Sequence, residues 1–417
     1  MSKNNSNFFK VKSSWSVIKD KLLGCYLAPY FQKVLITHKP ITYVDCFAGK
    51  GKFEDGNAGS PLIALQLRDE CLDKSAVNKK SNAIQMWFIE LNHSAALLEN
   101  VAQFSGQYGT PHVISGKYEE QIESLLRSKR EQNVFLYIDP YGIRALDMAL
   151  FDRFGTFGFS SFEMLINFNS FGFFRDACRV MSVDYREDEA LQGLDELVEY
   201  EPTEVNANQQ SEGILNGIAG GDYWKQIVRD FQAKQIDGYQ AEQRLSDEYK
   251  QRLRKRYSYV LDMPIRLKPN QRPKYRMIHV CDHEDGCFLM AENMQKRKDE
   301  LFTNIQQSGQ MSIFDFTTDY ASSVEGIYMS REQIKSKVKD HLLHQTSTIG
   351  IKRFLATFVN DYGLLCEFSM IYEILGELQI ERVADITREP PFTPKTGRPS
   401  AFWEEKGDHK VYIGRCE

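Results

Sequence analysis

Short runs of consecutive apolar residues alternate with stretches of helical periodicity through the first 180 positions. Before and between the runs, apolar side chains recur three and four positions apart, as on one face of a helix; the clearest such stretch, 14–36, precedes the first run. Runs that are apolar on both faces are typical of buried parallel strands. Their alternation with helices predicts an α/β fold with a Rossmann-like sheet. The runs lie at 41–47, 84–90, 112–116, 134–138 and 164–169.

The pattern changes twice further along the chain. Residues 184–236 are acidic and then glycine-rich, which predicts an inserted segment or lid, partly loop. A helix is expected at 239–257, and two paired strands at 263–267 and 275–282 would close the last edge of the sheet. Polar residues around 305–328 predict a linker.

Beyond the linker, three helical patterns precede two strand-like runs, 380–387 and 410–415. The turn-rich connection between these runs carries Lys395 and Arg398. Three helices and a hairpin with a basic tip describe a winged-helix-like domain, which either binds nucleic acid or docks on another protein. The expected domains are 1–304, with the insertion at 184–236, and 329–417, with 305–328 between them.

Composition adds limits to this picture. The chain has 417 residues, 42% hydrophobic and 26% charged, as expected of a folded protein with two or three domains. Its formal net charge of −5 means that nucleic-acid binding would depend on local basic patches. The eight cysteines form no CxxC pair and no apolar run approaches a membrane span, so we expect a cytoplasmic protein with reduced thiols.

The first apolar run leads into a glycine loop. Asp45 lies near the end of the run, and Gly49 and Gly51 follow. A buried strand ending in such a loop brings backbone N–H groups close to a nucleotide-like ligand. The carboxylate disfavours phosphate and suits a ligand with a cationic end, such as S-adenosylmethionine. The alternative is an ordinary glycine turn.

Two further positions fit the same ligand. Ser60 and Pro61 begin the next helix, whose N-terminus would point towards the loop and the ligand carboxylate. Glu90 ends the second run, where such folds place an acid on the ribose hydroxyls.

The run at 134–138 ends in Asp139, Pro140, Tyr141 and Gly142. Proline cannot continue a central strand, so this turn must project from the carboxyl edge of the sheet. The Asp139 carboxylate and the Pro140 carbonyl can accept hydrogen bonds from an exocyclic base amine, and the Tyr141 ring can stack on the base. A simple strand-ending turn is the alternative.

Two clusters further on have competing explanations. Five basic residues at the end of the 239–257 helix form either a phosphate-binding face or a solvated surface: Lys250, Arg252, Arg254, Lys255 and Arg256. The group Cys281, His283 and Cys287 supplies only three candidate ligands, so we expect no metal there.

These stretches, taken in order, resemble the three-Cys-motif partner (TcmP) family. The likeness rests on 43–51, 59–61, 138–142, 275–280 with His283 beyond, and 397–400, and it covers most of the chain. The resemblance implies a class I S-adenosylmethionine-dependent methyltransferase-like fold with an attached C-terminal domain. It also implies a partner protein with a three-cysteine motif that looks like a radical-SAM cluster site.

The resemblance also implies roles for individual residues. The cofactor would be held by Asp45, Phe47, Gly49, Gly51, Ser60, Glu90 and Tyr118, and the amine by Asp139, Pro140 and Tyr141. The turn has one proline, unlike the Asn/Asp-Pro-Pro-Tyr/Phe motif of adenine-N6 enzymes, and looks closer to the Asp-Pro-Phe-Gly of tRNA guanine-N2 dimethyltransferases. The usual acid of the third strand is missing, with Tyr118 as a candidate replacement.

The leading hypothesis is therefore methyl transfer to an exocyclic amine of a nucleic-acid base in DNA or RNA. One rival is a catalytically degenerate subunit that binds cofactor or nucleic acid beside its three-Cys partner. A second rival is a metal-dependent hydrolase built around Cys281, His283 and Cys287.

Overall fold

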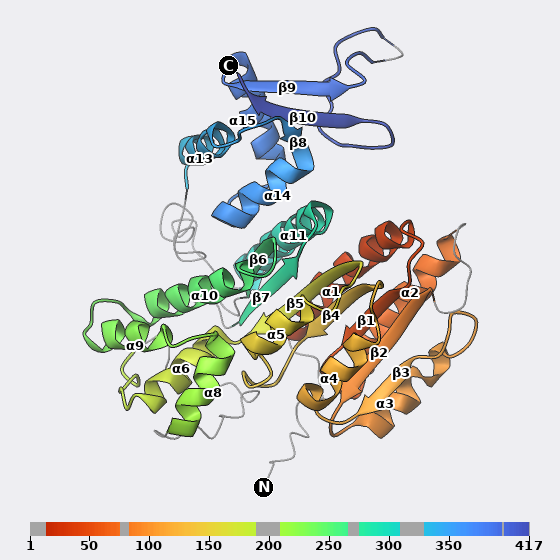
Figure 1. The fold of residues 1–417 in the computed structure, drawn as a ribbon, viewed down its shortest axis with the longest axis vertical. Coiled ribbons are helices and arrows are strands. Elements are labelled where there is room, and N and C mark those ends of the chain that lie inside the picture. The colour runs from red at the N-terminus through yellow and green to blue at the C-terminus, as the bar shows by residue number, and fades with distance from the viewer. Residues whose placement is uncertain are drawn as a thin grey trace.

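The computed structural model describes residues 14–75, 83–188, 209–265, 275–308, 329–393 and 396–416. Two parts are visible: a large α/β part and, above it in Figure 1, a smaller C-terminal module formed by residues 329–416. No helix within these residues is long and apolar enough to cross a membrane.

The α/β part is organised around a seven-stranded sheet of order β3-β2-β1-β4-β5-β7-β6. The strands β1 to β5 are parallel, and β7 runs antiparallel to both β5 and β6. The expected Rossmann-like α/β fold is therefore present, and the predicted last pair of strands does lie at the edge of the sheet. The strands are β1 Ile41–Asp45, β2 Ile84–Glu90, β3 His112–Ser115, β4 Asn133–Ile138, β5 Ser161–Phe168, β6 Tyr259–Ile265 and β7 Tyr275–Cys281.

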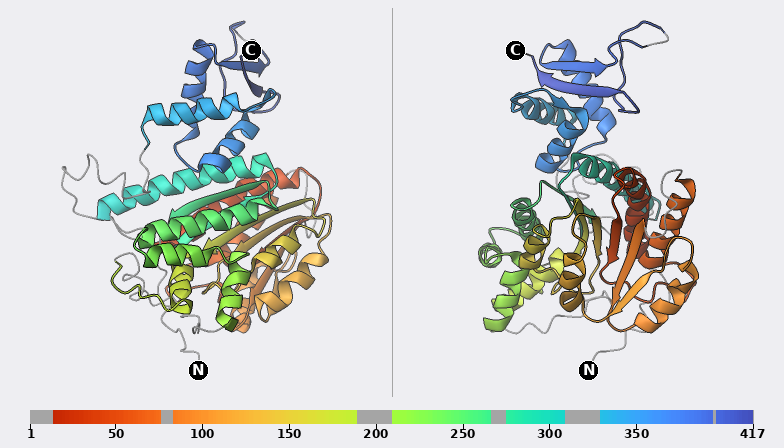
Figure 2. Two further views of the ribbon diagram at one scale, coloured as in Figure 1. Left: turned by 60° about the vertical axis from the view of Figure 1, so that its left-hand side comes forward. Right: turned by 45° about the vertical axis from the view of Figure 1, so that its right-hand side comes forward.

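Helices cover both faces of this sheet, which explains why its strands are apolar throughout (Figure 2). Tyr43 belongs to the core on one face and Val44 to the core on the other, as the alternation of side chains along a strand requires. The first face is covered by α1 Ser14–Leu35, α2 Ser60–Lys74, α3 Ser94–Val101 and α11 Glu284–Ser308. The second is covered by α4 Tyr118–Arg127, α5 Met148–Phe154, α6 Ser170–Val180 and α10 Gly238–Arg254.

Within the predicted insertion, the described residues are more helical than expected. The helices α8 Gln209–Ala219 and α9 Trp224–Gln232 pack on α5, α6 and α10. The Trp224 side chain is buried against Phe173 of α6. Residues 189–208 lie outside the described part, and a role as a lid stays a prediction.

The C-terminal module contains three helices and a three-stranded antiparallel sheet of order β8-β10-β9. It packs through α14 on α11 of the large part (Figure 1). The predicted helices and hairpin are present, although the first strand of the hairpin begins at Ala384, because α15 extends to Ile380. The elements are α13 Arg331–Leu343, β8 Ile349–Gly350, α14 Ile351–Tyr362, α15 Phe368–Ile380, β9 Ala384–Glu389 and β10 Lys410–Arg415. The helix α11 extends to Ser308, past the start of the predicted linker, and 309–328 lie outside the described residues.

A buried charge network joins β7 to α10. The Arg276 guanidinium donates to both Glu242 oxygens at 2.6 and 2.9 Å and to Asp262 at 2.7 Å, and Lys250 donates to Asp262 at 2.7 Å.

Removing one member of a buried ion-pair network leaves a charge without a partner, which costs roughly 3–5 kcal/mol. We therefore expect Arg276→Met to lower the free energy of unfolding in urea by about that amount. Arg244→Met removes an exposed arginine of α10 that pairs with Asp230 of α9, and should cost no more than about 1 kcal/mol. Equal losses in the two variants would contradict this account.

Candidate active-site cleft

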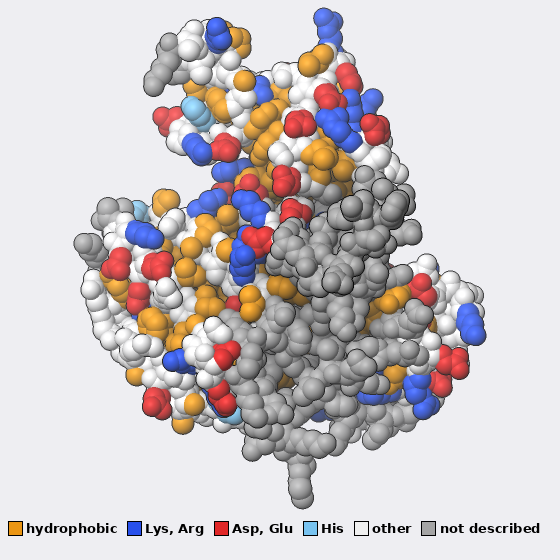
Figure 3. All heavy atoms as spheres, turned by 180° about the vertical axis from the view of Figure 1, so that it is seen from behind, with side chains coloured by type: hydrophobic (Ala, Val, Ile, Leu, Met, Phe, Trp, Pro, Cys, Tyr) orange, Lys and Arg blue, Asp and Glu red, His pale blue; other side chains and the backbone are white. Residues whose placement is uncertain are grey.

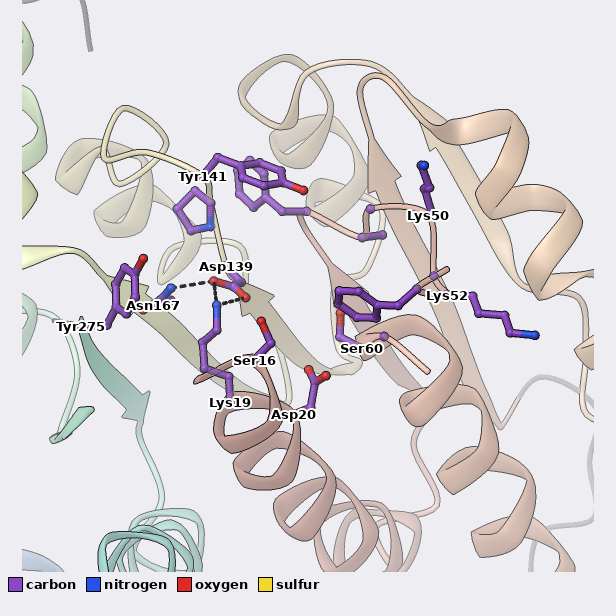
Figure 4. Close-up of a pocket in the computed structure, with 17 residues that line it drawn as sticks. Ser16, Lys19, Asp20, Lys50, Lys52, Ser60, Asp139, Tyr141, Asn167 and Tyr275 are labelled. Carbon is purple, nitrogen blue, oxygen red and sulfur yellow. Dashed lines mark hydrogen bonds and ion pairs between the residues drawn. The ribbon is translucent and has the colours of Figure 1, made fainter. Parts of the chain in front are cut away.

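A cleft lies at the carboxyl edge of the sheet, where the loops after β1 and β4 face each other (Figure 4). These two strands are neighbours, and the chain leaves them towards opposite ends of the sheet, so the cleft is at the topological switch point. Open α/β sheets bind their ligands at such points. The lining residues are Ser16, Lys19, Asp20, Phe47, Ala48, Gly49, Lys50, Gly51, Lys52, Phe53, Gly59, Ser60, Asp139, Pro140, Tyr141, Asn167 and Tyr275.

The glycine loop forms one wall of the cleft. Gly49 and Gly51 have φ values of 61° and 78°, in the left-handed region that favours glycine. The N–H of Gly49 donates to Glu90 at 2.8 Å. The other Glu90 oxygen accepts from the N–H groups of Asn92 and His93 at 2.9 and 3.0 Å. Glu90 thus ties the glycine loop to the end of β2, and its side chain is not among those that line the cleft.

Asp45 lies beneath the same wall. Its carboxylate is fully buried and accepts a hydrogen bond from the Ser60 hydroxyl at 2.7 Å and one from the Phe47 N–H at 3.2 Å. Burial raises the pKa of Asp45 to about 7, although both hydrogen bonds oppose the shift. Ser60 lines the cleft and Asp45 does not, so the carboxylate influences a ligand there through Ser60.

The raised pKa of Asp45 has a consequence for stability. Between the ordinary value of 3.8 and about 7, the folded protein keeps a proton that the unfolded chain has lost. The contribution of Asp45 to the free energy of unfolding therefore falls as pH rises through this range and levels off above it, by at most about 4 kcal/mol. Asp45→Asn should remove this slope, as measured by urea unfolding of both proteins from pH 4.5 to 8. Parallel pH profiles would show that Asp45 is ionised in the folded protein across the range.

Asp139 is the acceptor at the opposite wall. Both of its oxygens accept from the Lys19 ammonium, at 2.7 and 2.9 Å (Figure 4). The Asn167 amide donates to one oxygen at 2.7 Å and the Tyr137 hydroxyl to the other at 3.3 Å. Only 21% of the Asp139 side chain and 11% of the Lys19 side chain are exposed. The carboxylate is thus held in place and surrounded by donors before any ligand enters.

The turn after Asp139 completes this wall. Pro140 and Tyr141 line the cleft, and Tyr141 remains 44% exposed despite its size. The accessible interior of the cleft is about 90 Å³. A nucleoside-sized ligand needs several times this space, so side chains that project into the cleft must move when one binds.

The structure brings together most, but not all, of the residues expected from sequence. Tyr118 is buried away from the cleft, where its ring packs against Phe47 with 5.1 Å between centroids. Its hydroxyl has no hydrogen-bond partner among the described residues. The cleft is lined by Phe47, Gly49, Gly51, Ser60, Asp139, Pro140 and Tyr141, and not by Asp45, Glu90 or Tyr118.

The sequence pointed to the wrong residues of α1, since Lys21 and Tyr26 were its candidates for the ligand pocket. Ser16, Lys19 and Asp20 face the cleft at spacings of three and four, which marks one face of a helix. Lys21 and Tyr26, two other members of this helix, contact Glu300 and Glu163 and do not line the cleft. That spacing was visible in the sequence, but nothing there showed which face would meet the sheet edge.

Comparison with known proteins adds little to this geometry. No family model matches the sequence, and no curated protein is significantly similar to it. Among solved structures, the plantazolicin methyltransferase BamL, crystallised with a triazolic desmethylPZN analogue and SAH, is similar over 64% of this chain and 86% of its own. The identity is 12% and the TM-score 0.28. At this score the likeness supports no conclusion about the chain, so function is argued from the cleft itself.

The predicted basic face of α10 is mostly engaged with protein partners. Lys250 pairs with Asp262, Arg252 with Glu248, and Arg254 donates to the Asn360 carbonyl of α14 at 2.5 Å. The remaining two residues, Lys255 and Arg256, are exposed just beyond the helix. Three of the five residues thus have protein partners, and a phosphate-binding face at this end of α10 stays a prediction. On the face seen in Figure 3, basic and acidic side chains are interspersed over the described residues.

The hairpin tip and the cysteine cluster are also located. Arg398 is exposed on the connection between β9 and β10, and Lys395 lies outside the described residues. Cys281 and Cys287 are buried and donate to the carbonyls of His283 and Ala356. Among the described residues, no three His, Cys, Asp or Glu side chains are arranged to hold a metal ion.

Proposed function

We propose that this chain is an S-adenosylmethionine-dependent methyltransferase whose acceptor is an exocyclic amine of a nucleic-acid base. The observation that carries the proposal is the pairing of a glycine loop with the Asp139 turn across one cleft at the switch point of the sheet. The reversed strand β7, which lies between β5 and β6, is consistent with the class I methyltransferase-like fold that the TcmP resemblance implies.

The residues of the glycine-loop wall fit such a cofactor. The backbone of Gly49 and Gly51 can approach a nucleoside, and the Ser60–Asp45 pair offers an oxygen to the amino group of the cofactor. Glu90 holds the loop through Gly49. When bound, the cofactor supplies an electrophilic methyl group on a sulfonium.

The opposite wall would orient the acceptor. The Asp139 carboxylate and the Pro140 carbonyl accept the amine hydrogens, which keeps the nitrogen lone pair directed at the methyl carbon. Tyr141 stacks on a base that is flipped out or single-stranded. In the proposed reaction, the N–C bond would form as the C–S bond breaks, S-adenosylhomocysteine would leave, and the proton of the amine would pass to water. Positioning of this kind supplies most of the rate enhancement.

The test is a tritium-transfer assay from labelled S-adenosylmethionine to total RNA and total DNA, together with calorimetry of cofactor binding. Transfer to either pool supports the proposal and tells RNA from DNA. Cofactor binding without transfer to any pool would favour the degenerate subunit that acts with a three-Cys partner. The absence of any cofactor binding would overturn both.

A further inference from the structure

A second cavity, of about 630 Å³, lies where the C-terminal module meets α11. None of its lining residues also lines the cleft. We call it the junction cavity. Its walls are the stretch 291–296 of α11, the chain entering α15 at 364–372, and the connection between β9 and β10 at 402–409. Its volume is within the range of sites for small organic ligands.

Aromatic rings form much of the wall, and neighbouring side chains hold each ring. Tyr372 stacks on Trp403 with 5.1 Å between centroids, and Phe402 stacks on His409 at 4.2 Å. Phe368 is nearly buried and stacks on Phe288 of α11. Rings fixed in this way lose little conformational freedom when a ligand binds.

One acidic side chain in the wall has no direct partner. Glu292 of α11 is partly buried, and its carboxylate makes no hydrogen bond or ion pair with any described residue. Burial raises the pKa of Glu292; Lys296 and Lys33 oppose the shift, and Glu404 adds to it. Glu404, also in the wall, already pairs with Lys406. A half-buried carboxylate without a donor is costly unless a ligand supplies one.

We propose that the junction cavity binds a small organic cation with an apolar body, its ammonium group beside Glu292 and its body against the aromatic wall. Aromatic faces attract cations through the ring quadrupole, and the attraction grows where water is excluded. The wall holds three acids, Glu292, Glu367 and Glu404, against two lysines, Lys296 and Lys406, so its charge disfavours an anion. A neutral ligand would leave the Glu292 carboxylate without a counter-charge.

The location of the cavity links ligand binding to the docking of the C-terminal module on α11. Because the walls come from both α11 and the C-terminal module, a bound cation contacts both parts at once. It should therefore stabilise the docked arrangement of the module. This inference does not depend on the chemistry of the cleft.

The test uses benzyltrimethylammonium as the probe, with benzyl alcohol and benzoate as its neutral and anionic counterparts. Binding to the full-length protein is followed by calorimetry and by the fluorescence of Trp403, which lines the cavity. We expect the cation to bind at least about tenfold more tightly than either counterpart. Glu292→Gln, which keeps the side-chain shape, should weaken binding of the cation by about tenfold.

Two matched variants separate the junction cavity from other acidic sites. Glu300→Gln removes an acid of the same helix that pairs with Lys21 and Arg297, and Asp139→Asn removes the acid of the cleft. Both should bind the probe as the wild type does. The proposal is overturned if the wild type does not bind the probe at millimolar concentration, if benzoate binds as well as the cation, or if a correctly folded Glu292→Gln variant keeps full affinity.

Discussion

Asp139→Ala is expected to reduce methyl transfer by roughly a thousandfold while cofactor affinity changes less than about threefold. Asn167 and Tyr137 each donate to one oxygen of the carboxylate, so the wild-type protein presents it in one orientation even after an acceptor displaces Lys19. Alanine removes both acceptor oxygens from the wall opposite the glycine loop, and the amine then loses its alignment with the methyl group. The cofactor contacts, on the other wall, remain.

The measurement is single-turnover tritium transfer, with calorimetry of S-adenosylmethionine on the same preparations. Asp139→Asn should also be strongly impaired, because an amide carries no charge and only one acceptor oxygen. Asp147→Asn is the matched control. Asp147 caps α5 after the same strand, outside the cleft, and asparagine is an equally good cap. Undiminished turnover in Asp139→Ala would defeat the assignment.

Lys19→Met is expected to lower KM for the nucleic-acid acceptor by about tenfold and to leave kcat within about twofold. The ammonium of Lys19 bonds both oxygens of Asp139, the same atoms that the acceptor amine needs. Of the donors around Asp139, Lys19 has the longest and most flexible side chain, so the acceptor must displace it on binding. Methionine fills similar space without competing for the carboxylate.

Lys21→Met is the control for this variant. Lys21 lies on the same helix, two positions further on, and its ammonium pairs with Glu300 at the surface. Steady-state kinetics should therefore not change in Lys21→Met. If Lys19→Met instead lowered kcat strongly with KM unchanged, Lys19 would have to be a positioning residue for Asp139 in the reacting complex.

The strands and the loops that follow them could be predicted from sequence because each depends on local chemistry. The apolar runs gave β1, β2, β3, β4 and β5, since strands covered by helices on both faces have no polar side. The Asp139–Pro140 turn was placed at the carboxyl edge because proline ends a central strand. Alternation along a strand places residues two positions apart on the same face, so it does not separate Asn167 from Asn169; they differ because β5 ends at Phe168, between them. Asn167 lines the cleft and Asn169 caps α6.

Other elements were missed or assigned a different environment. The helix α11 was not predicted, although Cys287, Met290, Ala291 and Met294 are buried at helical spacing. Charged residues between and beyond these positions interrupt the apolar pattern, so the helical spacing is hard to recognise in the sequence. The basic run of α10 was correctly assigned to a helix, but Lys250 pairs with Asp262 of β6, and Arg254 donates to Asn360 of α14, 106 residues further along the chain.

The sequence by itself determined the α/β architecture, the glycine loop and the acidic turn, because period-two and period-3.6 patterns and proline and glycine act within a few residues. Only the tertiary structure decided which of these residues meet. Asp45 and Glu90 are turned into the loop that they support, whereas Lys19 of α1 reaches Asp139, 120 residues away. The junction cavity likewise exists only because α14 docks on α11. Two helices dock when their surfaces fit and bury apolar side chains, and those surfaces come from segments far apart in the chain. A local sequence pattern therefore does not show which helix will be the partner.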